Sequence, residues 1–425
     1  MTLLAVLFFL LTFLGMPIAL AIGIAGFSFF LFSGSIPVGI GVQQVASASQ
    51  SFPLLAVPFF VLAGHMMNKT GITSRLITCS NVLVSWMSGG LAQVCILLST
   101  LMGGVSGSAV ADAAMEARIL GPDMIKRGYS RGFTTAVIAC GSLITATIPP
   151  SLGLILYGFV GNVSIGRLFL AGVIPGLLMM AALMAVVAVI AKKRNYQAAR
   201  RELPKAAEVW RAVVEAKWAL LFPIALLIGI RGGIFTPSEV GAFAVVYAAV
   251  VGVLFHRELT WEKLVEALGE GVLDVGVIML IILLSGMVGY ALIFEQAPQN
   301  IAEAMLGLSK NPLVIVFLIL AFLFVAGLFV EATVLVLLLT PIFVPIIKNL
   351  GIDEVHFGIL MMSIVTFGGM TPPVGVAMYT VCSILDTPIE EYFVESLPFV
   401  AAILAVVAFL AFMPGLVLWL PNLLM

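Results

Sequence analysis

Residues 1–68 contain no lysine, arginine, aspartate or glutamate. Residues 1–32 form an apolar run, and a helix needs about 20 predominantly apolar residues to cross a bilayer. Of all 425 residues, 62 % are hydrophobic and 10 % are charged, whereas a soluble domain has about 25 % charged residues. Such a chain has too few polar side chains to cover a surface that faces water. The sequence therefore predicts a membrane protein with several crossings.

The apolar runs also indicate which secondary structure crosses the membrane. Only helices and closed β-barrels satisfy their backbone hydrogen bonds in lipid, and barrel strands show alternation over segments of about 10 residues. This sequence has long unbroken apolar runs instead, so we predict an all-α polytopic membrane protein. The runs lie near residues 3–32, 52–67, 76–102, 132–160, 166–191, 217–230, 238–256, 272–294, 312–347, 357–385 and 396–420.

Residues 192–217 hold eight of the twenty basic residues. Loops rich in Lys and Arg stay in the cytoplasm, and a patch that binds anionic lipid would lie on the same side. We therefore expect a first half of residues 1–191, a basic cytoplasmic loop of residues 192–217 and a second half of residues 218–425. The net charge of −1 gives no indication of nucleic-acid binding.

The two halves share their proline positions. The shift along the chain that carries Pro122 onto Pro345, here called the repeat shift, also carries Pro149 and Pro150 onto Pro372 and Pro373, Pro175 onto Pro398, and Gly104 onto Gly327. Of eight prolines in the first half with a partner position, four fall on proline, where proline at about 5 % of residues predicts well under one. We interpret this as an internal repeat, with transport parts near residues 88–165 and 310–388.

Charges predict that the second repeat is inverted. Basic residues surround Pro122 (Arg118, Lys126, Arg127 and Arg131), whereas the segment after Pro345 has one Lys against Asp353 and Glu354. By the positive-inside rule only the first segment is cytoplasmic. This topology also places an acidic turn at Asp386, Glu390 and Glu391 in the cytoplasm, although the turn has no basic residues of its own.

In transporters with inverted repeats, Gly/Pro-interrupted helices at matching positions mark the binding site. The first matching pair is Gly103–Ala109 and Gly327–Thr333, each in the middle of an apolar stretch. Two half-helices that meet at such a centre form a re-entrant hairpin, whose free carbonyl and hydroxyl groups can bind a cation. The alternative is close helix packing through Gly103 and Gly107.

The second matching pair is Thr145–Ser151 and Gly368–Val374, which contain Pro149-Pro150 and Pro372-Pro373. Two successive prolines remove two amide donors and open a helix. Open backbone at membrane depth persists where it is buried in protein or lines a cavity, and its oxygens suit Na⁺. The alternative is a purely structural kink.

Two acids accompany these breaks. Glu331 is the only charged residue between 311 and 347, and Asp112 lies four residues after Ser108. Intramembrane acids are functional by default, so either can bind a cation or orient a hairpin, and a structural role is equally open. The four cysteines lack metal-site spacing and are interpreted as core thiols, and the three isolated histidines as interfacial.

Five stretches of the sequence together carry a family resemblance, namely Gly104-Val-Ser-Gly-Ser-Ala, Gly121-Pro-Asp-Met-Ile-Lys-Arg-Gly-Tyr, Ile148-Pro-Pro-Ser, Ile165-Gly-Arg-Leu-Phe-Leu-Ala-Gly-Val-Ile-Pro-Gly and Thr371-Pro-Pro-Val-Gly. In this combination they resemble the large membrane subunit of tripartite ATP-independent periplasmic (TRAP) transporters. The resemblance covers nearly the whole chain. It implies a Na⁺-driven elevator in the bacterial inner membrane, with a scaffold and a mobile transport domain. It also implies a small four-helix membrane subunit, a periplasmic substrate-binding protein, and an organic acid such as sialic acid or a C4-dicarboxylate as substrate.

The resemblance further implies site residues. One Na⁺ site would comprise Ser106, Thr145, Ile148 and Pro150, and a second Gly327, Gly368, Thr371 and Val374. Substrate would bind between the hairpin tips at Ser106, Ser108 and Ser151, with the intramembrane acid Glu331 beside them. We find no intramembrane arginine near these motifs to bind a carboxylate.

Three other functions remain open. A subunit with its own ATPase is disfavoured because no Gly-Lys dipeptide, and so no P-loop, occurs. An intramembrane serine protease would use Ser106 as nucleophile and need a base such as His65 or His356. A channel for ions or solutes is the third.

Overall fold

The computed structural model describes residues 2–32, 36–50, 52–200, 202–372 and 374–425, and these form helices without any β-strand. The first half contains α1 (Thr2–Phe13), α2 (Ile18–Phe32), α3 (Val38–Ser49), the 3₁₀ turn η1 (Phe52–Leu55), α4 (Ala56–Lys69), α5 (Ile72–Val84), α6 (Gly90–Gly103), α7 (Ala109–Ile119), α8 (Gly121–Lys126), α9 (Arg131–Gly141), α10 (Leu143–Thr147), α11 (Leu152–Gly161) and α12 (Ile165–Lys193). The second half contains α13 (Ala206–Glu215), α14 (Lys217–Arg231), α15 (Pro237–Val250), the π-helical turn η2 (Val251–Phe255), α16 (Trp261–Phe294), α17 (Ala297–Leu308), α18 (Pro312–Gly327), α19 (Ala332–Asn349), α20 (Glu354–Gly368), α21 (Val376–Leu385), α22 (Ile389–Phe412), α23 (Pro414–Val417) and α24 (Trp419–Leu424).

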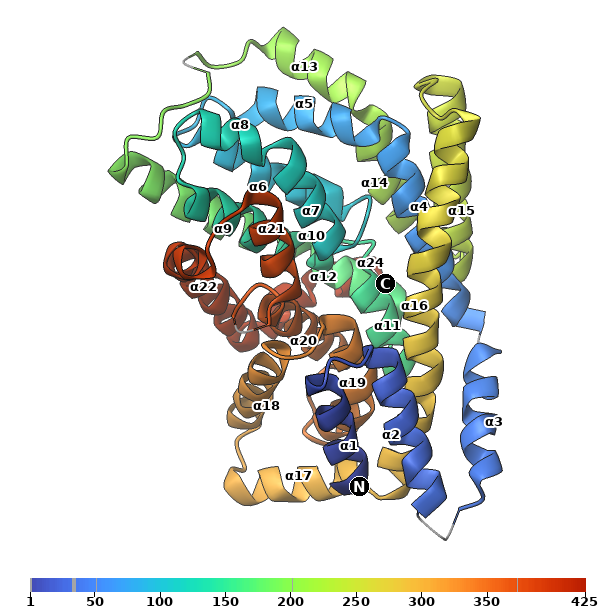
Figure 1. Ribbon diagram of the computed structural model, residues 1–425. Coiled ribbons are helices and arrows are strands. Elements are labelled where there is room, and N and C mark those ends of the chain that lie inside the picture. The colour runs from blue at the N-terminus through green and yellow to red at the C-terminus, as the bar shows by residue number, and fades with distance from the viewer. Residues whose placement is uncertain (1, 33–35, 51, 201, 373) are drawn as a thin grey trace.

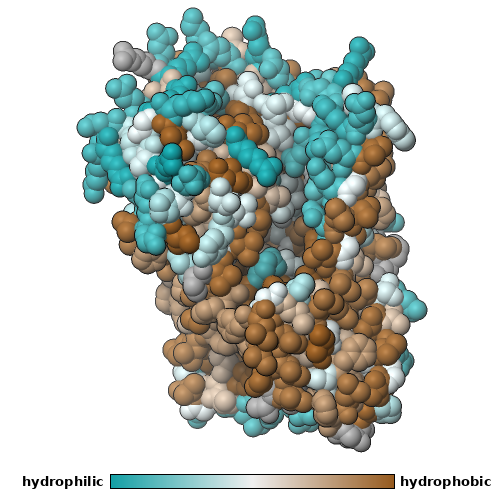
Figure 2. Space-filling model, viewed as in Figure 1, coloured by the Kyte–Doolittle hydropathy of each residue, from teal (hydrophilic) through white to brown (hydrophobic). Residues whose placement is uncertain are grey.

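Within the described residues, five helical segments are long and apolar enough to cross a membrane. They are α12, Ser238–Phe255, α16, α19 and α22, and the number rises to seven if the bent pairs α9–α11 and α13–α14 each count as one crossing. Figure 2 shows a broad hydrophobic band below a hydrophilic upper end, which in the view of Figure 1 carries α5, α8 and α13. The arrangement fits a protein surrounded by lipid.

The apolar run of residues 1–32 is divided into α1 and α2, which pack against each other. Gly15 has a φ of +83°, a conformation that glycine adopts without steric cost, and Pro17 lies just before α2. These two residues turn the chain between helices. The apolar run therefore forms two short helices instead of a single long one.

The segment 192–217 is not only a loop. It contains α13, which packs on α5 and then bends by 63° into α14. Ala212 and Ala216, four residues apart, are buried whereas Trp210 is exposed, so the segment has a helical periodicity despite its basic composition. The basic segment thus forms part of the hydrophilic end of the molecule.

Helices are interrupted at both pairs of predicted breaks. α6 gives way to α7 and α18 to α19, and the repeat shift carries the first residue of α7, Ala109, onto the first residue of α19, Ala332. α10 ends before Pro149 and α11 follows Ser151, while α20 ends at Gly368 and α21 begins at Val376. Pro372 lies in the second of these breaks, whereas Pro373 lies outside the described residues.

The half-helices pack both within each half and between the two halves. α6 contacts α9 and α10, and α18 contacts α20, while α7 contacts α21 and α19 contacts α11. In Figure 1, α6 and α7 lie in the upper part of the molecule and α18 and α19 in the lower part. All four breaks are thereby brought to the middle of the molecule.

The acidic turn before α22 lies beside the basic residues of the first half. Arg131 Nη1 donates to the carbonyl of Asp386 at 3.2 Å, and the Gly132 amide donates to Glu391 Oε1 at 2.9 Å. Arg194 donates to Glu395 further along α22 at 2.7 Å. The turn therefore takes its positive partner, Arg131, from the first half, although its own sequence has no basic residue.

Candidate functional site

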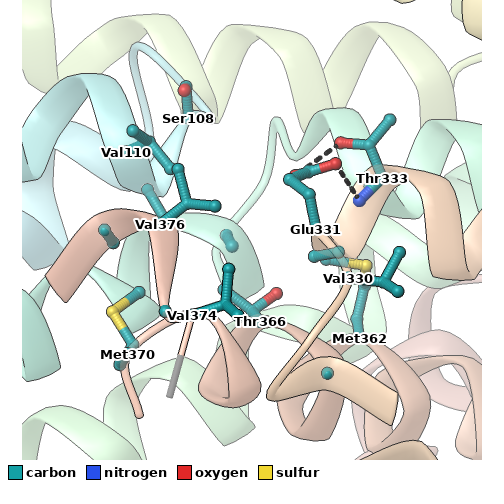
Figure 3. A pocket seen from close by; sticks show the side chains of 18 of the residues that line it. Ser108, Val110, Val330, Glu331, Thr333, Met362, Thr366, Met370, Val374 and Val376 are labelled. Carbon is teal, nitrogen blue, oxygen red and sulfur yellow. Dashed lines mark hydrogen bonds between the residues drawn. The ribbon is translucent and has the colours of Figure 1, made fainter. Parts of the chain in front are cut away.

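A cavity of about 100 Å³ lies where the helix breaks meet. Its wall includes the turn residues Gly107 and Ser108 from the first half and Gly327 and Glu331 from the second. Figure 3 shows Ser108 and Glu331 on different sides of this cavity, with Met362, Thr366 and Met370 below them. The cavity is thus shared by both halves of the chain.

Four half-helices begin at the cavity. Its lining includes the first residue of each of α7, α11, α19 and α21, namely Ala109, Leu152, Ala332 and Val376. A helix N-terminus carries a partial positive charge and free amide groups, so it attracts anions. Among the described lining residues none is Lys, Arg or His. An anion in this cavity would therefore meet backbone amides at helix N-termini rather than a basic side chain.

Ser108 and Ser151 are the N-caps of α7 and α11. The Ser108 hydroxyl accepts from the Ala111 amide at 3.4 Å, and Ser108 lines the cavity. Ser151 is fully buried, donates to the Ala146 carbonyl at 2.6 Å and does not belong to the described lining. Of these two predicted substrate residues, only Ser108 is placed at the cavity.

Glu331 is the N-cap of α19 and also lines the cavity. Its carboxylate accepts from the Thr333 amide at 2.8 Å, the Val334 amide at 3.3 Å and the Thr333 hydroxyl at 2.9 Å. A carboxylate at this position is favoured by the helix dipole. The predicted intramembrane acid is therefore held by its own helix.

The first predicted Na⁺ site is assembled where the α6–α7 turn meets the α10–α11 break. Gly107 has a φ of +65°, and a Cβ on this residue would clash with the carbonyl oxygen of Pro150. A Cβ on Gly103 would lie 3.1 Å from Thr145 Cα and 3.0 Å from Ile148 Cβ. Ser106 follows in the same turn, so the structure brings all four predicted residues to one place.

The second predicted Na⁺ site has the same construction. A Cβ on Gly327 would lie 3.2 Å from Gly368 Cα, so the two backbones are in contact. The Thr371 hydroxyl is shared between the Phe367 carbonyl at 2.9 Å and the Gly368 carbonyl at 3.2 Å, and the Val374 amide donates to the Leu328 carbonyl at 3.2 Å. The structure therefore also gathers the residues of this set.

Some residues at the site were not predicted from the sequence. Met362 and Thr366 of α20 line the cavity, and the fully buried Tyr392 hydroxyl donates to the Met370 carbonyl in the α20–α21 break. Nothing in their local sequence distinguishes them from other residues of apolar helices. Their positions depend on how the halves pack.

The structure gives Ser106 no histidine base among the described residues. Its hydroxyl donates to Asp112 Oδ2 at 2.6 Å. His65 contacts Glu270 and Asp274, and His356 is buried with its Nε2 2.9 Å from the Leu410 carbonyl oxygen. The serine-protease hypothesis therefore lacks its base.

All four cysteines are buried and free, as predicted.

Comparison with solved structures shows which known fold this chain shares. The crystal structure of the YdaH transporter of Alcanivorax borkumensis matches 88 % of this chain and 87 % of its own, with a TM-score of 0.61 and 12 % sequence identity. At that identity the likeness shows only that the two proteins share a fold.

Sequence comparison gives the family. Residues 5–416 match the family described as the tripartite ATP-independent periplasmic transporter, DctM component, and the chain belongs to it. The sialic acid TRAP transporter large permease protein SiaM of Vibrio cholerae is 38 % identical over 97 % of this chain and 96 % of its own length. The 2,3-diketo-L-gulonate large permease YiaN of Escherichia coli is 32 % identical over 95 % of each.

The resemblance inferred from the motifs is thereby confirmed. The chain is a large permease subunit of a TRAP transporter, and it is a transport protein rather than an enzyme. It is an integral protein of the bacterial inner membrane, in agreement with its membrane-spanning helices.

Proposed function

We propose that this subunit carries an organic acid across the inner membrane by Na⁺-coupled secondary transport. The observation that carries the proposal is the meeting of four half-helix N-termini at one cavity. Half-helix N-termini at the membrane midplane are a common site for the carboxylate of a transported substrate. They would also take the place of an intramembrane arginine, which we do not find near the motifs.

The named relatives suggest the substrate class. SiaM is named for sialic acid and YiaN for diketogulonate, and both compounds are sugar acids with a carboxylate. A C4-dicarboxylate is the smaller candidate. A cavity of about 100 Å³ is below the roughly 300–1,000 Å³ of typical ligand pockets, so binding of a sugar acid requires the hairpin tips to separate.

Two clusters of oxygen atoms would hold two or more Na⁺ ions. Their residues are Ser106, Thr145, Ile148 and Pro150 in the first half, and Gly327, Gly368, Thr371 and Val374 in the second. Carbonyl and hydroxyl oxygens at opened helices suit a hard cation. The buried, unpartnered Oδ1 of Asp112 beside the first cluster supports a cation there.

An elevator motion of inverted repeats would move these sites across the membrane. The proposal is supported by the helix boundaries that recur under the repeat shift and by the crosswise contacts of α7 with α21 and α19 with α11. The hairpins α6–α7 and α18–α19 would be re-entrant, and they approach the middle of the molecule from opposite ends (Figure 1). The parts near 88–165 and 310–388 would form the mobile domain.

The tripartite family name implies two partners. We propose that a small four-helix membrane subunit packs on this chain and that a periplasmic binding protein delivers the substrate. Lipid would surround the apolar band of Figure 2.

The test is uptake into proteoliposomes that contain this chain, its small subunit and a binding protein loaded with radiolabelled sialic acid, diketogulonate or a C4-dicarboxylate. We expect uptake with an inward Na⁺ gradient and none with an equal K⁺ gradient. Uptake at equal rates in both gradients would contradict Na⁺ coupling. Uptake without the binding protein at the full rate would contradict the delivery step.

A further inference from the structure

We infer that Asp112 supplies the negative charge of the Na⁺ site at the first hairpin; the inference rests on the proposed Na⁺ coupling. Asp112 lies in the first turns of α7 and is fully buried. Its Oδ2 accepts from the Ser106 hydroxyl at 2.6 Å, whereas its Oδ1 has no hydrogen-bond partner. A buried carboxylate oxygen without a hydrogen-bond partner is free to bind a cation.

Asp112 has no positive partner among the described residues, whose ion pairs all lie elsewhere. A buried carboxylate is costly unless a cation or hydrogen bonds compensate it. One hydrogen bond on one oxygen leaves the other uncompensated. A bound cation would complete both its coordination and its charge balance.

Glu116, one helical turn further along α7, shows the contrast. It is also fully buried, but its oxygens accept from the Ser99 hydroxyl at 2.8 and 3.0 Å and from the Cys95 thiol at 3.0 Å. Both of its oxygens therefore have a hydrogen-bond partner within the protein. Asp112 and Glu116 therefore form a matched pair of buried acids in which only Asp112 has an open oxygen.

The oxygens around Asp112 favour a monovalent cation. The Ser106 hydroxyl is hydrogen-bonded to the Asp112 carboxylate, and the backbone of the α6–α7 turn contacts Pro150 in the α10–α11 break. Divalent ions usually take several carboxylates or keep their waters, whereas one carboxylate with neutral oxygens balances a single positive charge. This set of ligands fits Na⁺.

The second hairpin differs at the equivalent positions. The repeat shift carries Asp112 onto Leu335 and Glu116 onto Leu339, so no acid stands there. The acid of that hairpin, Glu331, is already bound by Thr333 and Val334. We therefore expect the first site to bind Na⁺ more tightly than the second.

The experiment measures Na⁺ binding to the complete permease complex in nanodiscs, without substrate. ²²Na⁺ binding and the melting temperature are followed against Na⁺ concentration, with choline holding the ionic strength constant. For Asp112→Asn we expect the Na⁺ concentration at half-saturation of the tighter phase to rise at least tenfold, because the charge is lost. Glu116→Gln, the matched control, should stay within about twofold of the wild type.

The outcomes separate the inference from the function on which it rests. A wild-type complex that neither binds ²²Na⁺ nor is stabilised by it would overturn both. A wild-type response that Asp112→Asn retains unchanged would overturn the inference alone. Asp112→Ser, a smaller neutral replacement, is scored by the same criterion, so that a folding defect of one variant does not decide the result.

Discussion

Single residues at the helix breaks are defined by how closely two backbones approach. Gly327 and Gly368 are in contact in the second half, and Gly107 touches Pro150 in the first. Glycine is required at such contacts because any side chain would separate the two stretches of backbone. The Gly/Ser and Pro-Pro motifs thus mark contacts between breaks as well as the breaks themselves.

This contact predicts the effect of Gly368→Ala. The added methyl group would clash with the Gly327 backbone, and overpacking of a core costs about 1–3 kcal/mol. We expect a lower melting temperature for the purified protein and loss of uptake in proteoliposomes. Gly289→Ala in α16 is the control, since a Cβ there meets nothing within 4 Å. Equal melting temperatures for the two variants would show that the Gly327–Gly368 contact is not tight.

At the residue scale, the positions of the helix breaks could be predicted from the sequence better than the contacts of individual side chains. Glycine and proline act locally, so the breaks at Gly104 and Pro149 could be located from composition. Ser151 was predicted at the substrate site, yet its hydroxyl is directed to the Ala146 carbonyl. The partner of a hydroxyl depends on side-chain geometry, which residue spacing does not specify.

At the scale of elements, corresponding helices show both the similarity and the inequality of the halves. The repeat shift carries Lys126, where α8 ends, onto Asn349, where α19 ends, and each helix is followed by a glycine in the left-handed region. α8, which ends at Lys126 and is followed by Arg127, lies at the hydrophilic end, whereas α19 ends in the lower part of Figure 1. Equivalent elements therefore lie toward opposite ends.

The opposite placement can be tested with Lys126→Cys and Asn349→Cys. Both positions are exposed, and the four native cysteines are buried. If the repeats are inverted, a membrane-impermeant maleimide should label Asn349→Cys in intact cells and Lys126→Cys only after the inner membrane is permeabilised. The unmodified chain should remain unlabelled. Labelling of both variants from the same side would contradict inverted repeats.

Element boundaries were predictable where apolar periodicity ends, and less so where polar helices begin. α13 was predicted as loop because positive charges dominate residues 192–217. The acidic turn at Asp386 had no explanation in its own sequence, since its partner Arg131 is distant along the chain. Local patterns cannot show partners that only the packing of the halves supplies.

At the scale of the whole molecule, the elevator proposal requires the hairpin α6–α7 to slide past the scaffold. The hairpin turn contacts α14, which lies outside the proposed mobile parts, and a Cβ on Gly104 would lie 3.3 Å from the Cβ of Pro223. Disulfides join cysteines whose Cβ atoms are roughly 3.5–4.5 Å apart, so a small adjustment permits a cross-link. The contact offers a way to fix the two parts in one position.

We therefore expect the double variant Gly104→Cys/Pro223→Cys to form a disulfide on oxidation and to lose uptake when oxidised. A mobile domain tied to the scaffold cannot carry its site across the membrane, although Na⁺ can still bind from the accessible side. Uptake in proteoliposomes should return when dithiothreitol reduces the bond, so that the reduced protein serves as its own control. A cross-linked protein that transports at the reduced protein's rate would show that the α6–α7 turn does not move relative to α14, and transport would then require gating around a fixed site instead.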